Sequence, residues 1–323
     1  MSRSLAAAAA AVALHGAVWF YACSRLASET GAALDNLRRQ GWEVVSDAPQ
    51  RTGWPLAAGV RYGRVRLDGT SAGVPAGWRA DDLDFRLRAA QPGTLLLTPS
   101  RMQEVRLGGG DWLQVAASLQ LAVQADSAEA VGRDLAVHLP GGPVTIAAMH
   151  ANLQGRTLQL DLAGIEAGPF LGAGHLVAET ILTGPLLPGP DPAAAATAWR
   201  DGGGVLQVNA LQLDAGGLQA SASGAAGLDP ALQPVLNLTA RVQGYQTALD
   251  RLTQAGVIQT SAAVAAKAVL GLLSGRSPGA PATFPVSVAG GIVSVAGFPL
   301  LRLPAVDWTA APRQRHGMTM PEQ

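Results

Sequence analysis

The sequence predicts a mainly β protein with a large antiparallel sheet, because apolar and polar residues alternate along most of its length. The alternation is regular over residues 83–88, 112–125, 158–162 and 236–242. A period of two places every second side chain on the same face, so each strand has one apolar and one polar face. The apolar face of such a sheet must be covered, either by its own chain or by a ligand.

The composition suits many short strands and excludes some functions. The 323 residues include 39 glycines and 21 prolines, enough for many turns, and only 14% of the residues are charged. The formal net charge is zero, so neither a nucleic-acid-binding surface nor an acidic partner is indicated. Cys23 is the only cysteine, which rules out an internal disulfide and a cysteine-based metal site.

The first 23 residues are typical of a membrane-inserting segment. Leu5–Cys23 carries no formal charge and would span roughly 28 Å as a helix, close to the thickness of a bilayer core. Arg3 precedes it, and Trp19, Phe20 and Tyr21 lie where an aromatic belt is expected. We favour an uncleaved signal anchor over a cleaved signal peptide or a lipoprotein signal that ends at the cysteine. The anchor predicts a single-pass inner-membrane protein, held through residues 5–23, with the bulk of the chain in the periplasm.

Glycine, proline and aspartate divide the rest of the chain into elements. A helical stripe continues over Ser24–Gln40 and ends at Gly41. The predicted strands are Trp42–Ser46, Val60–Leu67, Leu83–Arg88, Thr94–Thr98, Trp112–Ala125, Arg133–Leu139, Val144–Asn152, Thr157–Ala163, Gly174–Leu182, Val205–Leu213, Leu218–Ser223, Pro234–Val242, Val286–Ala289 and Ile292–Ala296. A short helix is predicted over Pro192–Arg200, and a helix pair within Gln246–Ser274, joined near Gly256. The predicted domains are an anchor with its following helix (1–40), a single elongated β-rich periplasmic domain (41–310) and a disordered tail (311–323).

No catalytic or metal-binding motif has the context that its chemistry requires. Gly69–Gly73 matches the G-x-S-x-G of a nucleophile elbow, but the Val-Pro-Ala-Gly that follows cannot begin the necessary helix. Gly172–Gly174 lacks the third glycine of a dinucleotide-binding loop. Asp81, Asp82 and Asp84 lack the spacing of a calcium loop, and the five histidines lack zinc-ligand spacing. We therefore predict no enzymatic activity, no cofactor and no metal.

Two turns combine glycine, a large aromatic residue and proline. Gly53–Leu56 lies near the start of the β region, and Gly297–Leu300 near its end. The proline favours an extended conformation at the preceding aromatic residue. We expect both turns to be tight strand connections with the aromatic ring in the core.

These turns, together with the segments between them, carry a resemblance to a known family. Residues 41–45, 53–56 and 65–67 resemble the opening of AsmA-like envelope proteins, in which a membrane anchor leads into amphipathic strands. Residues 205–244, followed by a helix pair and by Gly290–Val295, are similar to a strand–glycine–strand run of the same superfamily. Within it, the chain looks most like the uncharacterised bacterial domain of unknown function family numbered 2125, over residues 10–305.

The resemblance implies a long, curved sheet in the periplasm with a half-open apolar groove that is associated with lipid handling and envelope homeostasis. It transfers no catalytic residues, and the chain is much shorter than the large members that could bridge two membranes. The candidate groove residues lie on the apolar faces of two strands: Leu119, Leu121, Val123, Leu236 and Leu238. One hypothesis is a protein that binds or passes the acyl chains of a phospholipid or glycolipid. The alternative is an envelope assembly factor with a closed core, a protein partner and no lipid.

Overall fold

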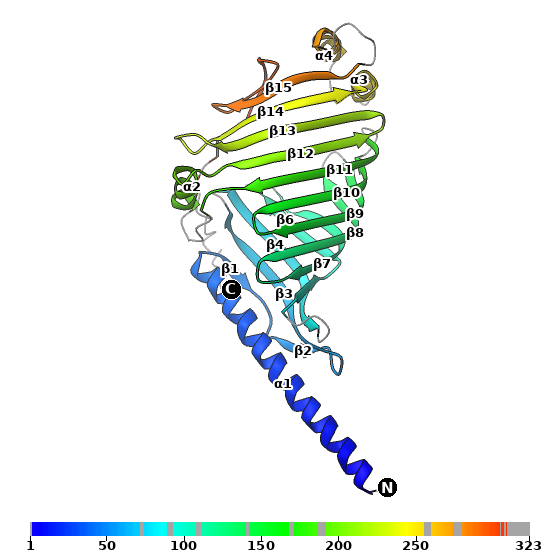
Figure 1. Ribbon diagram of the computed structural model, residues 1–323, viewed down its shortest axis with the longest axis vertical. Coiled ribbons are helices and arrows are strands. Elements are labelled where there is room, and N and C mark those ends of the chain that lie inside the picture. The colour runs from blue at the N-terminus through cyan, green and yellow to red at the C-terminus, as the bar shows by residue number, and fades with distance from the viewer. Residues whose placement is uncertain are drawn as a thin grey trace, which may run out of the picture.

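The computed structural model describes residues 2–71, 74–88, 93–107, 111–139, 142–167, 171–185, 192–254, 260–273, 280–303, 305, 306 and 308. These residues form one long antiparallel sheet of 17 strands with helices at its margins (Figure 1). The helices are α1 (Ser2–Arg39), α2 (Pro192–Asp201), α3 (Tyr245–Gln254) and α4 (Thr260–Leu273).

The 17 strands account for most of the described chain, which confirms the mainly β prediction. They are β1 (Glu43–Val45), β2 (Gln50–Thr52), β3 (Ala57–Ser71), β4 (Val74–Arg88), β5 (Leu95–Pro99), β6 (Met102–Leu107), β7 (Leu113–Val123), β8 (Ser127–Leu139), β9 (Gly142–Gln154), β10 (Thr157–Ala167), β11 (Leu171–Leu182), β12 (Leu206–Ala215), β13 (Leu218–Leu228), β14 (Pro234–Gln243), β15 (Ala282–Ala289), β16 (Ile292–Val295) and β17 (Phe298–Arg302). The sheet is twisted and curved: β3 and β4 run steeply at its lower end, whereas β10 to β15 lie across its upper part (Figure 1).

The topology is a meander, in which each strand from β7 to β17 pairs antiparallel with the next. At the lower end β1 and β2 share one edge of β3, and β5 and β6 both lie between β4 and β7. Residues that lie opposite each other on paired strands share a face, so the apolar positions form one continuous apolar face. Tyr62, Leu121, Leu160 and Leu238 mark this apolar face; the opposite face is the polar face.

Helix α1 covers the apolar face at the lower end of the sheet. Its Leu26 packs with Val60, Tyr62 and Phe85 in a buried cluster, and Val60 is completely inaccessible. The Thr30 hydroxyl hydrogen-bonds the Tyr62 hydroxyl at 2.7 Å, which fixes the helix against β3. A second, smaller cluster lies at the upper end, where α3 and α4 pack against β13 and β15.

A local reversal in β3 keeps the apolar residues on one face. Val60 and Tyr62 lie in the same cluster as Val65. Tyr62 and Val65 are three positions apart, and in a regular strand this odd offset would place them on opposite faces. Arg64, between them, adopts a left-handed conformation with φ 48°. Without this irregularity Val65 and the apolar residues beyond it would point to the polar face, because a one-residue slip reverses a strand's faces.

The predicted helices at 192–200 and 246–274 are confirmed as α2, α3 and α4, and Gly256 lies outside the described residues. Three strands were not predicted, namely β2, β6 and β17. β2 has only three residues, and neither β6 nor β17 alternates strictly between apolar and polar residues. The tail at 311–323 lies outside the described residues, and the domain boundaries stay predictions.

The prediction that both turn aromatics lie in the core is wrong. The Trp54 side chain is 48% exposed, and Phe298, the first residue of β17, is 60% exposed. Trp54 packs against α1 rather than into the sheet, with its ring 5.5 Å from that of Trp19. Each ring lies at a margin of the sheet, where too few neighbouring residues are present to enclose it.

The predicted single-pass inner-membrane location is also wrong. Among the described residues, no helix is long and apolar enough to cross a membrane. The C-terminal half of α1 is strongly charged, and Arg25 and Glu29 form an ion pair on it. Trp19, which we expected in an aromatic belt, instead donates its indole N–H to the Ala57 carbonyl at 2.8 Å. Cys23, the residue of the lipoprotein alternative, is completely buried.

Candidate functional site

The centre of the apolar face, from β7 to β14, consists of three rows that run across the strands. The register joins opposite residues into each row. The middle row is Leu121, Ala130, Ala151, Leu160, Ala178, Leu211, Ala222 and Ala240. One flanking row is Val123, Ala128, Leu153, Leu158, Thr180, Val208, Gly224 and Leu238. The other is Leu119, Gly132, Met149, Leu162, Leu176, Leu213, Ala220 and Val242. We call these 24 positions the central patch.

The central patch is apolar but poorly buried. None of its side chains is charged, and Thr180 is its only polar residue. Gly132 is its only buried member; the others are at least partly exposed, and Leu153 and Leu158 are 40% and 41% exposed. The described helices pack chiefly at the two ends of the sheet, α1 on β3, and α3 and α4 on β13 and β15. At the upper end Ala240 and Val242 of the patch pack against the cluster of Tyr245, Ala282 and Phe284, so this end of the patch is partly covered. A contiguous apolar surface of this extent is typical of an interaction site.

Side-chain size varies systematically across the central patch. The middle row contains five alanines among its eight positions, whereas each flanking row contains two residues of alanine or glycine size. The middle row therefore carries smaller side chains on average than the rows beside it, although Leu121, Leu160 and Leu211 interrupt it. From β7 to β14 the row crosses seven strand spacings, roughly 34 Å at about 4.8 Å each.

All five predicted groove residues lie on the apolar face, and all are partly exposed. The structure joins Val123 and Leu238 in one flanking row, although six strands separate them. Leu236 lies just outside the central patch, opposite Val288 of β15. The β7 residues and the β14 residues do not touch each other, so they mark the two ends of the candidate site rather than its centre.

The residues between these ends were missed as site residues. Leu160, Leu162 and their neighbours show the same alternation in the sequence, which could have placed them on the apolar face. The alanines of the middle row give no sequence pattern of their own, because their alignment depends on the register of seven strand pairs. These alanines form a row only in the folded sheet.

The polar face at the lower end is held by buried carboxylates. Asp84, 4% exposed, accepts hydrogen bonds from Arg61 at 3.3 Å and Arg86 at 2.7 Å. Asp68 likewise accepts from Arg106 at 2.7 Å and from Arg66. Burying a carboxylate is costly unless it is paired in this way, so these clusters are structural.

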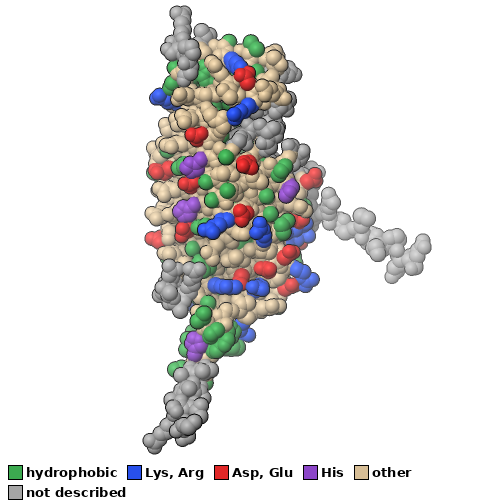
Figure 2. Space-filling view, turned by 90° about the vertical axis from the view of Figure 1, so that its right-hand side faces the viewer, with side chains coloured by type: hydrophobic (Ala, Val, Ile, Leu, Met, Phe, Trp, Pro, Cys, Tyr) green, Lys and Arg blue, Asp and Glu red, His purple; other side chains and the backbone are tan. Residues whose placement is uncertain are grey.

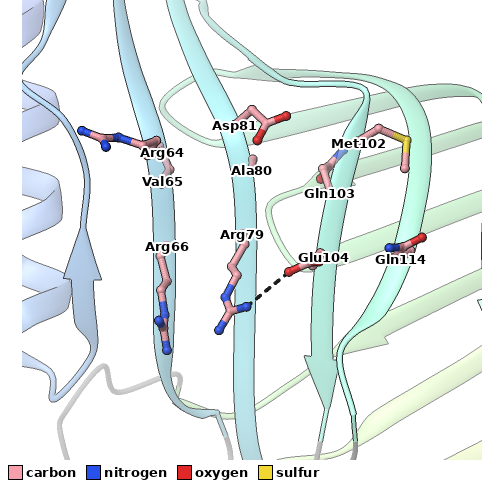
Figure 3. Close-up of a pocket in the computed structure, with 10 residues that line it drawn as sticks. All are labelled: Arg64, Val65, Arg66, Arg79, Ala80, Asp81, Met102, Gln103, Glu104 and Gln114. Atoms are coloured by element: carbon pink, nitrogen blue, oxygen red, sulfur yellow. Dashed lines mark hydrogen bonds and ion pairs between the residues drawn. The ribbon is translucent and has the colours of Figure 1, made fainter. Parts of the chain in front are cut away.

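A pocket of about 360 Å³ lies beside these clusters, between β3, β4, β6 and β7 (Figure 3). Glu104 points toward Arg79, and their side chains form an ion pair at 3.3 Å (Figure 3). The other two arginines of the lining, Arg64 and Arg66, pair with Asp47 and Asp68. Each arginine therefore already has a carboxylate partner, which weakens any attraction for an anionic ligand. The pocket contains no cysteine, histidine or serine that could act as a nucleophile or a base.

Histidines and charged residues spread over the middle of the polar face (Figure 2). His150 lies 2.9 Å from Glu129, and His175 lies 2.8 Å from Asp161, with all four side chains about half exposed. In the described part of the chain, no three His, Cys, Asp or Glu side chains are grouped to hold a metal ion. The G-x-S-x-G motif lies where β3 ends at Ser71 and β4 begins at Val74, between two strands rather than before a helix.

Three pKa shifts reflect packing and ion pairing rather than a catalytic arrangement. The hydrogen bond from Arg64 lowers the pKa of Asp47, and burial raises the pKa of the Cys23 thiol. The hydrogen bond to Asp84 raises the pKa of Arg86. None of these groups lies in the central patch.

The fold and this surface define a class of protein built on a long open sheet with an exposed apolar centre. The family model described as an uncharacterised protein conserved in bacteria (DUF2125) matches residues 19–304, and the chain belongs to this family. The chain matches no curated protein and no solved structure. The wider AsmA-like resemblance stays a prediction.

Proposed function

We propose that the central patch binds the acyl chains of membrane lipids, without catalysis. The observation that carries this proposal is that 23 of the 24 positions of the central patch are at least partly exposed, and all but Thr180 are apolar or glycine. Apolar surface left in water costs about 25 cal/mol per Å². A ligand that covers the patch therefore gains binding energy from removing both its own apolar surface and that of the protein from water.

An alkyl chain fits the shape and the chemistry of the patch. The patch offers almost no hydrogen-bonding side chains, so it suits a ligand that needs none. One leaflet of a bilayer core is about 15 Å deep, so a single acyl chain is shorter than the roughly 34 Å middle row. Each buried CH₂ group contributes about 0.8 kcal/mol, and ten or so would give useful affinity after the cost of ordering the chain. A half-open groove of the AsmA-like kind, and a role in the cell envelope, form part of this proposal.

The test is a substitution that places a large side chain in the middle row and changes no other residue of the sheet. Ala151 lies in that row, and Ala148 lies on the same strand with its side chain on the polar face. We expect Ala151→Phe to weaken binding of the fluorescent fatty acid cis-parinaric acid at least about tenfold, because the ring occupies the path of the alkyl chain. The matched control, Ala148→Phe, should bind like the wild type. Fluorescence titration of the full chain measures both.

Two results would contradict the proposal. The wild-type chain could fail to bind the fatty acid, or both phenylalanine variants could bind it as the wild type does. The first result favours the assembly-factor alternative, in which a protein partner covers the central patch. The second would place fatty-acid binding outside the middle row.

A further inference from the structure

An exposed apolar surface, which we call the apolar tip, lies near the lower end of the sheet, where α1 passes the turn between β2 and β3; α1 itself continues past this turn toward Ser2 (Figure 1). Hydrophobic side chains gather there (Figure 2). The apolar tip comprises Leu14, Val18, Phe20 and Tyr21 of α1 with Trp54 and Leu56 of the turn. All six are 48–86% exposed, and Leu56 is the most exposed large hydrophobic residue in the described chain.

Two backbone carbonyls of the turn and of the start of β3 have hydrogen-bonding partners on α1. The Trp19 indole N–H donates to the Ala57 carbonyl, and the His15 Nε2 lies 2.8 Å from the Pro55 carbonyl oxygen. The Trp54 ring packs against both of these rings, at 5.0 Å from His15 and 5.5 Å from Trp19. The turn is thereby fixed to the helix, and these two carbonyls no longer depend on water. Such a surface can enter an apolar medium at low cost.

Arg51 is the arginine beside the tip, and it donates a hydrogen bond to the Ser24 hydroxyl at 3.3 Å. Arg25, further along α1, forms an ion pair with Glu29 at 2.8 Å and therefore adds little net positive charge. The Arg51 guanidinium lies 4.2 Å from the centre of the Phe20 ring, so the charge sits beside the exposed aromatic residues. Tryptophan and tyrosine beside arginine are typical of a surface at the lipid headgroup level, and anionic lipid attracts the arginine.

The tip also leads to the apolar face of the sheet. An apolar cleft of about 320 Å³ lies between α1 and the turn, and Leu87 of β4 is part of its lining. Leu87 lies opposite Leu95 of β5, and Leu95 lies opposite Val123 of the central patch. A continuous series of apolar residues therefore runs from the tip to the proposed acyl-chain site.

We propose that the apolar tip docks on the surface of an anionic phospholipid bilayer. Leu56, Tyr21 and Trp54 enter the headgroup region to a depth of about 5–10 Å, and Arg51 contacts lipid phosphates. A protein bound in this way lies at the bilayer surface, so the docking does not require a membrane-spanning helix. The cleft is then the end at which an acyl chain reaches the sheet.

Vesicle flotation of the full chain tests this docking. The vesicles contain phosphatidylcholine alone or equal parts of phosphatidylcholine and phosphatidylglycerol. We expect the wild-type chain to float with the mixed vesicles and to bind the neutral vesicles less. Leu56→Asp should lower the bound fraction at least about tenfold, because it removes the most exposed apolar side chain and adds a repelled charge. Val18→Asp, on α1, should act in the same direction.

The matched control is Val264→Asp, at the opposite end of the molecule. Val264 lies on α4 and is 62% exposed, close to the 59% of Val18, so the substitution adds the same charge at a similarly exposed valine. It should float like the wild type. The docking proposal would be contradicted if the wild-type chain did not float with the mixed vesicles. It would also be contradicted if Val264→Asp and Leu56→Asp lowered the bound fraction equally. A lipid-free dimer that Leu56→Asp dissociates would assign the tip to a second copy of the chain instead.

The docking and the acyl-chain site can fail separately, although the direction of lipid entry rests on the proposed function. Leu56→Asp should still bind cis-parinaric acid, whose binding needs no bilayer. Ala151→Phe should still float with mixed vesicles. If the chain floats with vesicles but binds no fatty acid, the docking proposal stands and the acyl-chain site is contradicted. If it binds the fatty acid but does not float, only the docking proposal is contradicted.

Discussion

The two halves of the apolar face have the same sequence pattern and opposite environments. At the lower end α1 covers β3 and β4, and Val60, Tyr62 and Phe85 are buried. Between β7 and β14 the same alternation continues, but side chains such as Leu153 and Leu158 stay about 40% exposed. The polar faces differ in parallel: Asp84 is buried among arginines, whereas Asp161 is half exposed beside His175.

This difference shows that alternation specifies an apolar face without specifying what covers it. A helix that packs on the face makes a core with a large share of the folding energy. An uncovered face contributes less to folding and remains available for a ligand. The same residue type should therefore respond differently to substitution in the two regions, which the following three comparisons test.

The largest expected difference concerns a charge on the apolar face. Val60→Asp should abolish folded protein, because an unpaired carboxylate in a closed core costs several kcal/mol. Leu160→Asp, in the central patch, should remain folded, because its carboxylate can stay partly hydrated. Circular dichroism during thermal unfolding compares the two. Loss of folded protein in both variants would mean that the central patch is a packed core and would rule out the proposed site.

A smaller difference is expected for a leucine shortened to alanine in each region. Leu26→Ala, on α1, should cost about 2–4 kcal/mol, because the side chain is enclosed by Val60 and Tyr62. Leu153→Ala should cost about 1 kcal/mol, because much of its side chain is already in water. Denaturant titration measures the free energy of unfolding of both variants. A larger loss for Leu153→Ala than for Leu26→Ala would reverse the assignment of covered and open regions.

The smallest expected difference is on the polar face. Asp84→Asn should lower the free energy of unfolding by about 1–3 kcal/mol, because it removes the buried charged acceptor of Arg61 and Arg86, whose half-exposed side chains can regain hydration. Asp161→Asn should cost about 1 kcal/mol or less, because its pairing with His175 is solvent-exposed. Denaturant titration again measures the free energy of unfolding of both variants. Equal losses would show that the two regions are equally well packed.

Much of the fold could be predicted from the sequence, and less of the candidate site. Alternation placed Leu119, Leu121 and Leu238 on the apolar face, and local capping and breaking residues placed α2, α3 and α4. The middle row could not be predicted, since Ala130, Ala151 and the other alanines meet only through the register of the sheet. The exposure of Trp54 was missed because a turn sequence does not reveal which other segments lie beside it.

By itself the sequence determined the family, the mainly β architecture and the existence of an apolar face, because these depend on composition and on a period of two residues. Tertiary structure alone decided where α1 lies, which half of that face is buried, and that α1 and the β2–β3 turn form one apolar tip. The reason is physical: burial depends on contacts between segments that are distant in the chain. Trp19 and Trp54 become neighbours, and Leu121 and Leu160 come to lie in one row, only when the sheet has formed.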